Sequence, residues 1–278
     1  MVERGGLENR CGRKSTEGSN PSLSAIFLSR NMLRFQPIYR TEPLMHIHIV
    51  HAHPEPASFT SAMKDMAVSV LRAQEHVVSV SDLYAMNWNP VASAADFGSR
   101  QDADYLVYAL EQRYNWANGS IAPDIQAEVD RLMAANVLIL SFPLYWFSTP
   151  AIMKGWIDRV LLSGLCYGGK RFYDQGGLRG KKALVACTLG GQEHMFGKDA
   201  IHGEIDAMLT PLLRGTLAYT GMDVLTPFLG YHIPYLDQKE RAKILEDYSA
   251  RLLSITNEAP LPMPSLDDYD HQLHPKSR

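Results

Sequence analysis

From Met45 onward, short apolar runs alternate with segments in which apolar residues recur every three or four positions. The first pattern predicts strands buried on both faces, and the second predicts amphipathic helices that pack on them. The predicted strands run from about Ile47 to Ala52, Val77 to Asp82, Val137 to Phe142, Ala183 to Thr188 and Val224 to Leu229. This order of elements predicts an α/β protein with a doubly wound, five-stranded parallel sheet covered by helices on both faces.

Capping and turn residues locate the predicted helices. Ser58 can cap one helix, and Thr149 followed by Pro150 supplies an N-cap and a first-turn proline for another. Further helices are predicted from about Pro123, from Gly203 to Ala218 and from Asp237 to Ile255. Because Pro211 lies in the middle of the second of these, a kink or break is expected there.

The segment from Ser141 to Trp156 joins a buried strand to a helix through three large, flat side chains, Tyr145, Trp146 and Phe147. A strand that leads directly into a helix suits the carboxyl edge of an open α/β sheet, where ligands bind. The combination indicates a flat conjugated ligand, such as a flavin ring, rather than a phosphate alone. Taken alone, these aromatic residues could equally pack the helix against the sheet.

Three regions of different character follow one another along the chain. Residues 1–44 show no strand alternation and no sustained helical period, and they carry seven Lys and Arg against four Glu. Residues 45–258 carry the alternating pattern and are predicted to form one domain, whereas the proline-rich residues 259–278 are predicted to form an irregular C-terminal arm. Between Met86 and Pro123 lies an insertion too long for an ordinary connection. Its aromatic residues could line a site, form a subunit contact or pack as a satellite cluster.

The first 44 residues are predicted to be an unstructured leader that is not part of the native protein. A transit peptide would be poor in acidic residues, whereas Glu3, Glu8 and Glu17 lie here. A disordered regulatory arm is a second alternative. We favour a third, because Gly18-Ser-Asn-Pro21 is what the T-arm consensus of a tRNA gene encodes when it is read in frame. On this hypothesis the natural protein begins at Met45.

Composition and charge exclude several classes of partner. With 46% apolar residues and a net charge of −3, the 278-residue chain can bury one sizeable core and is not expected to bind nucleic acid or an anionic membrane. No apolar run approaches the roughly 18 residues needed to cross a bilayer. Cys11, Cys166 and Cys187 are odd in number and far apart, which suits a reducing compartment, so a cytoplasmic location is expected.

Three predicted strand ends meet at one edge of such a sheet: His53 to Thr60, Pro143 to Phe147 and Thr188 to Gly191. The helix start in the first segment could bind phosphates, and the aromatic turn in the second could hold a ring. In the third, Gly190 and Gly191 would allow backbone N–H groups to approach a ligand closely. The sequence contains no Walker motif and no Gly-x-Gly-x-x-Gly fingerprint, so a P-loop or dinucleotide-binding Rossmann site has no motif behind it.

Ten histidines raise the question of a metal site. Strand alternation places His46 and His48 on one face and His51 and His53 on the other, and no carboxylate or cysteine follows at ligand spacing, so no metal is expected. His202, beside a glycine at a predicted helix start, is better placed for catalysis. Imidazole can donate a hydrogen bond or a proton near neutral pH.

From Met45 to about Asp270 the chain resembles the NAD(P)H:quinone oxidoreductases of the DT-diaphorase type. The resemblance lies in Ser58-Phe59, Ser81-Asp-Leu-Tyr-Ala-Met86, Phe142-Pro-Leu with Trp146-Phe147, Pro150-Ala-Ile with Lys154-Gly-Trp156, Gly190-Gly191 and Ile201-His-Gly203. It implies a flavodoxin-like homodimer that binds FAD at the subunit interface. Such an enzyme passes hydride from NAD(P)H to the flavin and then to a quinone in a ping-pong cycle.

Carried over residue by residue, the resemblance implies two catalytic residues and an FAD site. His202 would stabilise charge on the reduced flavin, and Tyr167 would close the pocket, with the partner subunit as its expected source. The implied FAD site comprises His53, Ser58, Phe59, Thr60, Pro143, Leu144, Trp146, Phe147, Thr188, Gly190, Gly191, Ile233 and Arg241, with Tyr145, Leu189 and Phe196 in the same stretches.

Phe196 departs from the pattern of the family it resembles. The best-known members have a tyrosine there, whose hydroxyl works with the histidine in a proton relay beside the flavin. Because phenylalanine cannot donate that hydrogen bond, we expect His202 to act directly or through water, assisted by the Gly190 and Gly191 amides. A second pocket tyrosine is also missing after Tyr167, so a roomier quinone pocket is expected.

The sequence therefore predicts an FAD-dependent, two-electron NAD(P)H dehydrogenase (quinone). Two alternatives stay open. An FMN-dependent azoreductase or nitroreductase has the same fold and ring chemistry, although the long insertion and the segment after Leu229, including Arg241, favour the larger FAD. A regulatory flavoprotein subunit of a membrane potassium-efflux system would need a dedicated partner surface, which this sequence does not reveal.

Overall fold

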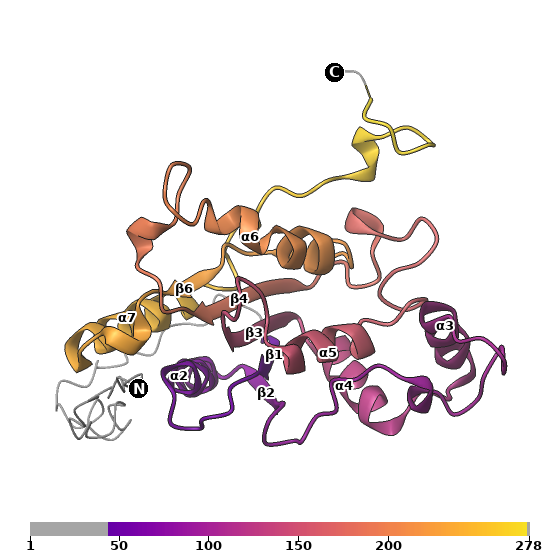
Figure 1. The fold of residues 1–278 in the computed structure, drawn as a ribbon, viewed down its shortest axis with the longest axis horizontal. Coiled ribbons are helices and arrows are strands. Elements are labelled where there is room, and N and C mark those ends of the chain that lie inside the picture. The colour runs from indigo at the N-terminus through magenta and orange to yellow at the C-terminus, as the bar shows by residue number, and fades with distance from the viewer. Residues whose placement is uncertain (1–43, 277–278) are drawn as a thin grey trace, which may run out of the picture.

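Strands that are far apart in the sequence pair side by side in one parallel sheet (Figure 1). The computed structural model describes residues 44–276, so the leader prediction lies outside the described residues except at its last position. The strands are β1 (His46–His51), β2 (Val77–Asp82), β3 (Val137–Pro143), β4 (Lys182–Thr188), β5 (Asp223–Val224) and β6 (Phe228–Gly230). Their order is β2-β1-β3-β4-β5, with β6 also paired to β4, and every pair is parallel. The predicted doubly wound α/β fold is confirmed.

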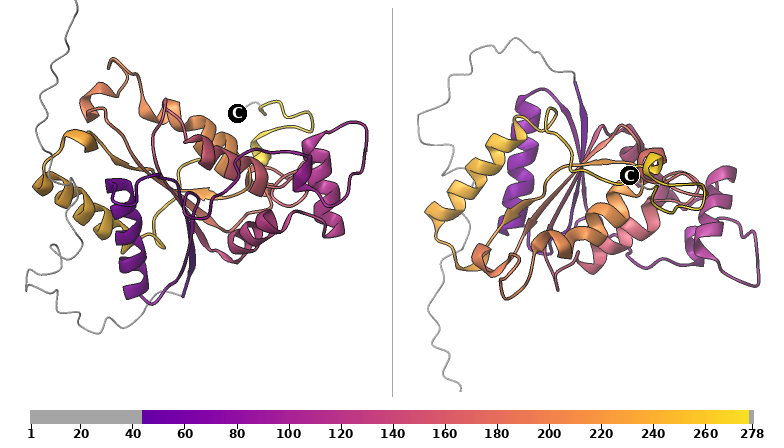
Figure 2. Two further views of the ribbon diagram at one scale, coloured as in Figure 1. Left: turned by 60° about the horizontal axis from the view of Figure 1, so that its bottom comes forward. Right: turned by 90° about the horizontal axis from the view of Figure 1, so that it is seen from above.

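Helices cover both faces of the sheet (Figure 2). One face carries α2 (Phe59–Ala73) and α7 (Gln238–Leu252), and the other carries α4 (Pro123–Ala134), α5 (Ala151–Val160) and α6 (Ile205–Leu212). In β3, Val137 and Ile139 belong to the core under α2 and α7, whereas Leu138, Leu140 and Phe142 belong to the opposite core. Every residue of β3 is buried, which is why its sequence is a continuous apolar run.

The shorter elements lie mainly in the connections. They are α3 (Tyr108–Asn118) and the 3₁₀ helices Ala94–Asp96, Tyr173–Gln175, Glu193–Met195, Ile233–Tyr235 and Leu266–Asp268. Across residues 44–276, none of the helices combines the length and apolar character that a membrane crossing needs.

Two predicted boundaries are wrong in detail. The run from Val224 to Leu229, predicted as one strand, is divided into β5 and β6. Pro227 lies between them, and proline has no N–H to donate to the ladder. The N-cap of α5 is Pro150 rather than Thr149, and no side chain caps this helix.

The predicted irregularity around Pro211 is confirmed. The helix expected from Gly203 begins instead at Ile205 and ends at Leu212, one residue after the proline. The backbone then continues as a π-helical segment, Leu213–Ala218. Proline cannot donate the regular hydrogen bond to the preceding turn, and the wider π turn accommodates the interruption without ending the helical path.

A buried carboxylate joins the sheet to α4 and α5. Glu128 is fully buried and accepts hydrogen bonds from Ser81 Oγ at 2.9 Å and from Trp156 Nε1 at 2.7 Å. Arg131 forms an ion pair with it, and His48 Nε2 lies 3.8 Å away. Burial alone would raise the pKa of Glu128, but the nearby His48 and the hydrogen bonds from Trp156 and Ser81 hold that pKa below its ordinary value. The ionised carboxylate thereby fixes α5, which follows directly after the aromatic turn.

The insertion between β2 and α4 is anchored by one buried guanidinium. Arg159 of α5 is 3% exposed and donates to one carboxylate oxygen of Asp96 at 2.8 Å, while Tyr108 donates to the other. Arg159 also forms an ion pair with Asp124 at 2.9 Å, and its guanidinium carbon lies 4.6 Å from the centre of the Trp88 ring. Trp88 and Tyr108 therefore pack the insertion onto the main domain.

Candidate functional site

A cavity of about 380 Å³ lies at the carboxyl ends of β1, β3 and β4. These strands are neighbours with β3 in the middle, so the three segments that follow them meet at one edge. The cavity is lined by His53, Glu55, Ala57, Ser58, Phe59, Thr60, Pro143, Leu144, Tyr145, Thr188, Leu189, Gly190, Ile233, Pro234 and Arg241. The predicted convergence of strand ends is thus present in the structure.

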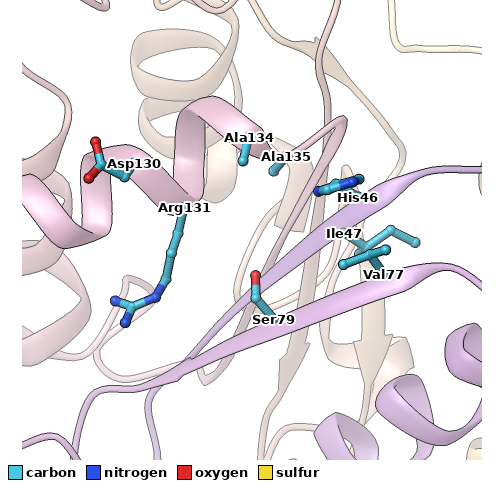
Figure 3. A pocket seen from close by; sticks show the side chains of 8 residues that line it. All are labelled: His46, Ile47, Val77, Ser79, Asp130, Arg131, Ala134 and Ala135. Carbon is cyan, nitrogen blue, oxygen red and sulfur yellow. The ribbon is translucent and has the colours of Figure 1, made fainter.

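A second cavity, of about 320 Å³, lies at the opposite edge of the sheet (Figure 3). It is formed by the last turns of α4 and by the first residues of β1 and β2, including His46 and Val77. Its one guanidinium, that of Arg131, is already paired with Glu128. The C-terminal end of a helix carries partial negative charge, which disfavours anions. The second cavity therefore does not fit a phosphate-bearing ligand. The first, called here the carboxyl-edge cavity, is the candidate site.

The start of α2 gives the cavity an anion-binding end. Ser58 is the N-cap, and its Oγ accepts the Ser61 N–H at 3.1 Å. The first turn of α2 has no acidic residue that would offset the partial positive charge of the helix end, and the Glu55 carboxylate in the preceding loop accepts the Ala57 N–H at 2.8 Å. Thr60 Oγ1 lies 2.7 Å from Thr188 Oγ1, which ties this helix start to the end of β4. The N-terminal end of a helix in this setting suits a phosphate group.

A buried histidine beneath the cavity orders the loop that precedes α2. The Ser61 hydroxyl donates to the backbone carbonyl of Glu55 at 3.1 Å, so the contact of 3.1 Å between His51 Nε2 and Ser61 Oγ requires a proton on Nε2. The neutral His51 ring then accepts the Ser141 hydroxyl at Nδ1, at 3.0 Å. Burial lowers the pKa of His51 to about 4, which keeps the ring neutral in this tautomer.

The other strand histidines also have identifiable partners. His48 is buried, with Nδ1 2.8 Å from Ser79 Oγ. His53 lines the cavity, and its Nδ1 accepts the Glu55 N–H at 3.0 Å, which leaves the proton of the neutral ring on Nε2. Burial lowers the pKa of His53. In the part of the chain that the structure describes, no three His, Cys, Asp or Glu side chains are grouped to hold a metal ion.

The aromatic turn has a strained backbone. Trp146 and Phe147 both have left-handed conformations, with φ of 51° and 57°. Tyr145 and Ser148 exchange two backbone hydrogen bonds of 2.9 Å across them. Positive φ at both central residues is the signature of a type I′ turn, which favours Asn and Gly. Large side chains at such positions cost free energy, and sites of this kind persist where they present a group for function. The Trp146 side chain is 95% exposed beside the cavity.

An aromatic cluster adjoins this turn and contains the predicted catalytic histidine. The His202 ring lies 5.5 Å from the Phe147 ring and 5.2 Å from the Phe196 ring, measured between centroids. Phe196 also packs against Tyr231 at 5.8 Å. A Cβ on Gly191 would approach the Phe196 ring to 2.9 Å, so a larger residue there would displace this ring. His202 is half-buried, held between aromatic rings at the edge of the site.

The predicted site residues fall into three groups. Most of them line the carboxyl-edge cavity. Trp146, Phe147, Gly191, Phe196 and His202 lie outside its lining, in the adjoining turn and cluster. Tyr167 is in neither place within one chain; its ring packs 5.7 Å from that of Tyr219.

Several residues of the site were missed by the sequence reasoning. Glu55, Ala57 and Pro234 line the cavity, and their positions between or beside predicted residues could have identified them. The supporting roles of His51 and of His232 had no local signal, because their partners are distant in the sequence.

Comparisons with known proteins agree with this fold and site. A family model described as a flavodoxin-like fold matches residues 45–254. Together with the parallel sheet and the cavity at its carboxyl edge, this match defines the class of flavodoxin-like oxidoreductases. Within that class, the chain belongs to the NAD(P)H dehydrogenase (quinone) family.

Three similar proteins illustrate this membership. NAD(P)H dehydrogenase (quinone) 1 of Rattus norvegicus is 41% identical over 214 residues, which cover 77% of this chain and 78% of that protein. Ribosyldihydronicotinamide dehydrogenase (quinone) of Homo sapiens is 40% identical over 215 residues, or 77% of this chain and 93% of that protein. The crystal structure of a candidate quinone reductase from Klebsiella pneumoniae has a TM-score of 0.80 and 34% identity, and covers 84% of this chain and 94% of its own.

Replacing Trp146 by Asn should relieve strain in the aromatic turn. Asn favours the left-handed region, and the exposed indole loses little packing, so the free energy of unfolding without ligand should rise by about 1 kcal/mol. Denaturant unfolding of the unliganded protein measures this. Tyr105→Asn, at a similarly exposed aromatic outside the turn, is the control. A Trp146→Asn protein no more stable than the unaltered chain would contradict the strain assignment.

Stability should fall in acid through His51. Its pKa is about 4 in the folded protein against 6.5 when exposed, so between these pH values the unfolded chain binds the extra proton. The free energy of unfolding should therefore decrease by about 1.4 kcal/mol per pH unit as the pH drops from 6.5 towards 4. Above pH 6.5 the ring is neutral in both states, so His51 adds no pH dependence there.

His51→Gln should flatten this dependence, because the glutamine amide keeps a donor for Ser61 but does not titrate. Denaturant unfolding from pH 4.5 to 7 gives the two slopes. Parallel slopes for the variant and the unaltered chain would refute the assignment.

Proposed function

We propose that this chain is an FAD-dependent, two-electron NAD(P)H:quinone oxidoreductase whose site is the carboxyl-edge cavity. The observation that carries the proposal is that the α2 N-terminus and the strained aromatic turn lie at the same edge of the sheet. The helix N-terminus suits phosphates and the aromatic turn suits a flat ring, and a flavin nucleotide contains both. Relatives named NAD(P)H dehydrogenase (quinone) and ribosyldihydronicotinamide dehydrogenase (quinone), at about 40% identity, support the same reaction.

The donors around the cavity fit the parts of FAD. The first-turn amides of α2 and the hydroxyls of Ser58 and Thr60 would bind phosphate oxygens. Trp146 and Phe147 would contact the ring. Bound FAD would supply a ring that accepts hydride from NAD(P)H and passes two electrons to a quinone.

Arg241 favours FAD over the smaller FMN. It lines the cavity from α7, is 6% exposed, and its Nη2 donates to the Ile233 carbonyl at 3.1 Å. A guanidinium held in the cavity lining by this hydrogen bond suits a second phosphate, which FAD has and FMN lacks.

His202 is the proposed group that holds a proton at the edge of the ring. Phe196 lies 5.2 Å from it and offers no hydroxyl, and the Tyr231 ring packs on Phe196. The imidazole nitrogens of His202 are therefore the donors on the ring that packs against Phe147. The amides of Gly190 and Gly191 would assist by stabilising negative charge on the pyrimidine edge.

A homodimer is proposed, with Tyr167 of one subunit completing the site of the other. In support, Tyr167 lies away from the cavity of its own chain, and the aromatic turn leaves Trp146 95% exposed on the side open to a partner or ligand. We also propose one domain over residues 45–258 and a cytoplasmic location. Cys166 and Cys187 are free thiols rather than a disulfide, which accords with a reducing compartment.

Cofactor analysis tests the proposal directly. The purified full chain should release FAD on denaturation, identified by chromatography against FMN standards, and should oxidise NADH or NADPH with a panel of small quinones. Release of FMN would contradict the choice of FAD, whereas failure to bind any flavin under reconstitution would contradict the proposed function.

His202→Ala should slow flavin reduction by about 10²-fold, because it removes a preorganised donor beside the ring. Stopped-flow absorbance of the flavin with NAD(P)H measures this step. His194→Ala, an exposed histidine in the same loop, is the matched control and should leave the rate unchanged. Phe196→Tyr combined with His202→Ala should recover part of the loss. An unchanged rate in His202→Ala would remove His202 from the mechanism.

A further inference from the structure

The turn Gly230–Tyr235 is bonded along its length to the glycine segment Leu189–Gln192. The Leu189 N–H donates to the Gly230 carbonyl at 2.9 Å, and the Ile233 N–H donates back to the Leu189 carbonyl at 3.1 Å. The His232 N–H donates to the Gly191 carbonyl at 2.9 Å. Leu189 and Gly190 of this segment line the carboxyl-edge cavity, as do Ile233 and Pro234 of the turn, so the two bonded segments form one wall together.

The His232 side chain adds two contacts to the same segment. Its Nδ1 lies 3.2 Å from the Gly190 carbonyl oxygen, and its Nε2 lies 3.3 Å from Gln192 Nε2. A carbonyl oxygen can only accept, so Nδ1 must carry the proton that is donated. In the neutral ring Nε2 then has a free electron pair, which accepts an N–H of the Gln192 amide. The two contacts are mutually consistent in one tautomer.

The conformation of His232 is also fixed from its other side. Its backbone is left-handed, with φ of 58° and ψ of 21°, a region in which histidine is better tolerated than most residues. The Tyr235 ring packs on the imidazole at 4.8 Å with an interplanar angle of 33°, and the Tyr235 N–H donates to the His232 carbonyl at 3.0 Å. The imidazole is therefore held between Tyr235 and the glycine segment.

Gly190 makes this support necessary. A Cβ added there would meet no protein atom within 4 Å, so side-chain packing does not hold this residue. Glycine also has more backbone freedom than any other residue. The position of the Gly190 and Gly191 peptide groups consequently depends on the hydrogen bonds from the 230–235 turn.

We propose that His232 is a positioning residue, which holds the Gly190–Gly191 peptide groups in the conformation that contacts the flavin. This rests on the proposed function, in which those amides stabilise charge on the ring. The imidazole acts through its Nδ1–H on the Gly190 carbonyl, with Gln192 fixing the tautomer, and it does not itself contact the reacting atoms.

The test compares His232→Ala with His232→Asn in the full chain. Asn tolerates the left-handed backbone, and its amide nitrogen can replace Nδ1 as the donor. His232→Ala should raise the dissociation constant of FAD about five- to tenfold, as expected for one or two lost hydrogen bonds, and should make the midpoint potential of the bound flavin more negative. His232→Asn should stay within about twofold of the unaltered chain, and His194→Ala serves as the control.

Fluorescence quenching of FAD and a redox titration give the two readouts, and hydrogen exchange of residues 189–192 without cofactor gives a third. Exchange in this segment should be faster in His232→Ala and unchanged in His232→Asn. If alanine prevents folding, His232→Gly removes the ring without backbone strain and should behave as predicted for alanine.

Two results would overturn the proposal: unchanged affinity, potential and exchange in the ring-deletion variant, or equal losses in Asn and Ala. A chain that binds no flavin would count against the proposed function, while the exchange comparison would still decide whether His232 orders the segment.

Discussion

The burial of β3 on both faces is the constraint on which the site depends. Because each residue of β3 is enclosed between two layers of helices, the chain can leave the core only after Pro143, at the carboxyl edge. The helix that follows is itself fixed, since Trp156 donates to the buried Glu128 carboxylate. The aromatic turn is therefore held at both ends. That restraint is what allows Trp146 and Phe147 to remain in left-handed conformations that neither side chain favours alone.

Uncharged histidines organise much of the polar structure around the cavity. His51 donates from Nε2 to a serine that supports the loop before α2, and His232 donates from Nδ1 to the glycine segment across the cavity. In each case a backbone carbonyl, which can only accept, determines which nitrogen carries the proton: that of Glu55 acts through the Ser61 hydroxyl, and that of Gly190 acts directly. A neutral ring orients backbone without adding charge, so the positive end of α2 and Arg241 remain the dominant features for an anionic ligand.

The apolar runs were sufficient to predict the sheet, the helices that cover it and the convergence of three strand ends, because these follow from local periodicity. The apolar runs did not predict the break between β5 and β6, because the run is mainly apolar although Pro227 lacks the backbone N–H that a strand needs. They also could not predict the left-handed turn at Trp146, which has the composition of a core segment and depends on restraints from β3 and α5. The hydrogen bonds from Trp156 and Ser81 to Glu128 join residues 28 and 47 positions apart, and the His232 side-chain contacts join residues 40 and 42 positions apart, so no local pattern could reveal them.

The buried guanidinium of Arg159 makes the main domain depend on the insertion between β2 and α4. It lies on α5 of the main domain, yet it shares its charge between Asp96 of the insertion and Asp124 at the start of α4, and stacks on Trp88. Deleting the insertion would remove Asp96 and Trp88 and would leave the 3% exposed guanidinium with Asp124 as its remaining carboxylate, which destabilises a buried cation. The insertion is thus not a detachable module. Gain or loss of this segment in a descendant protein would require a compensating change at position 159 in the same lineage.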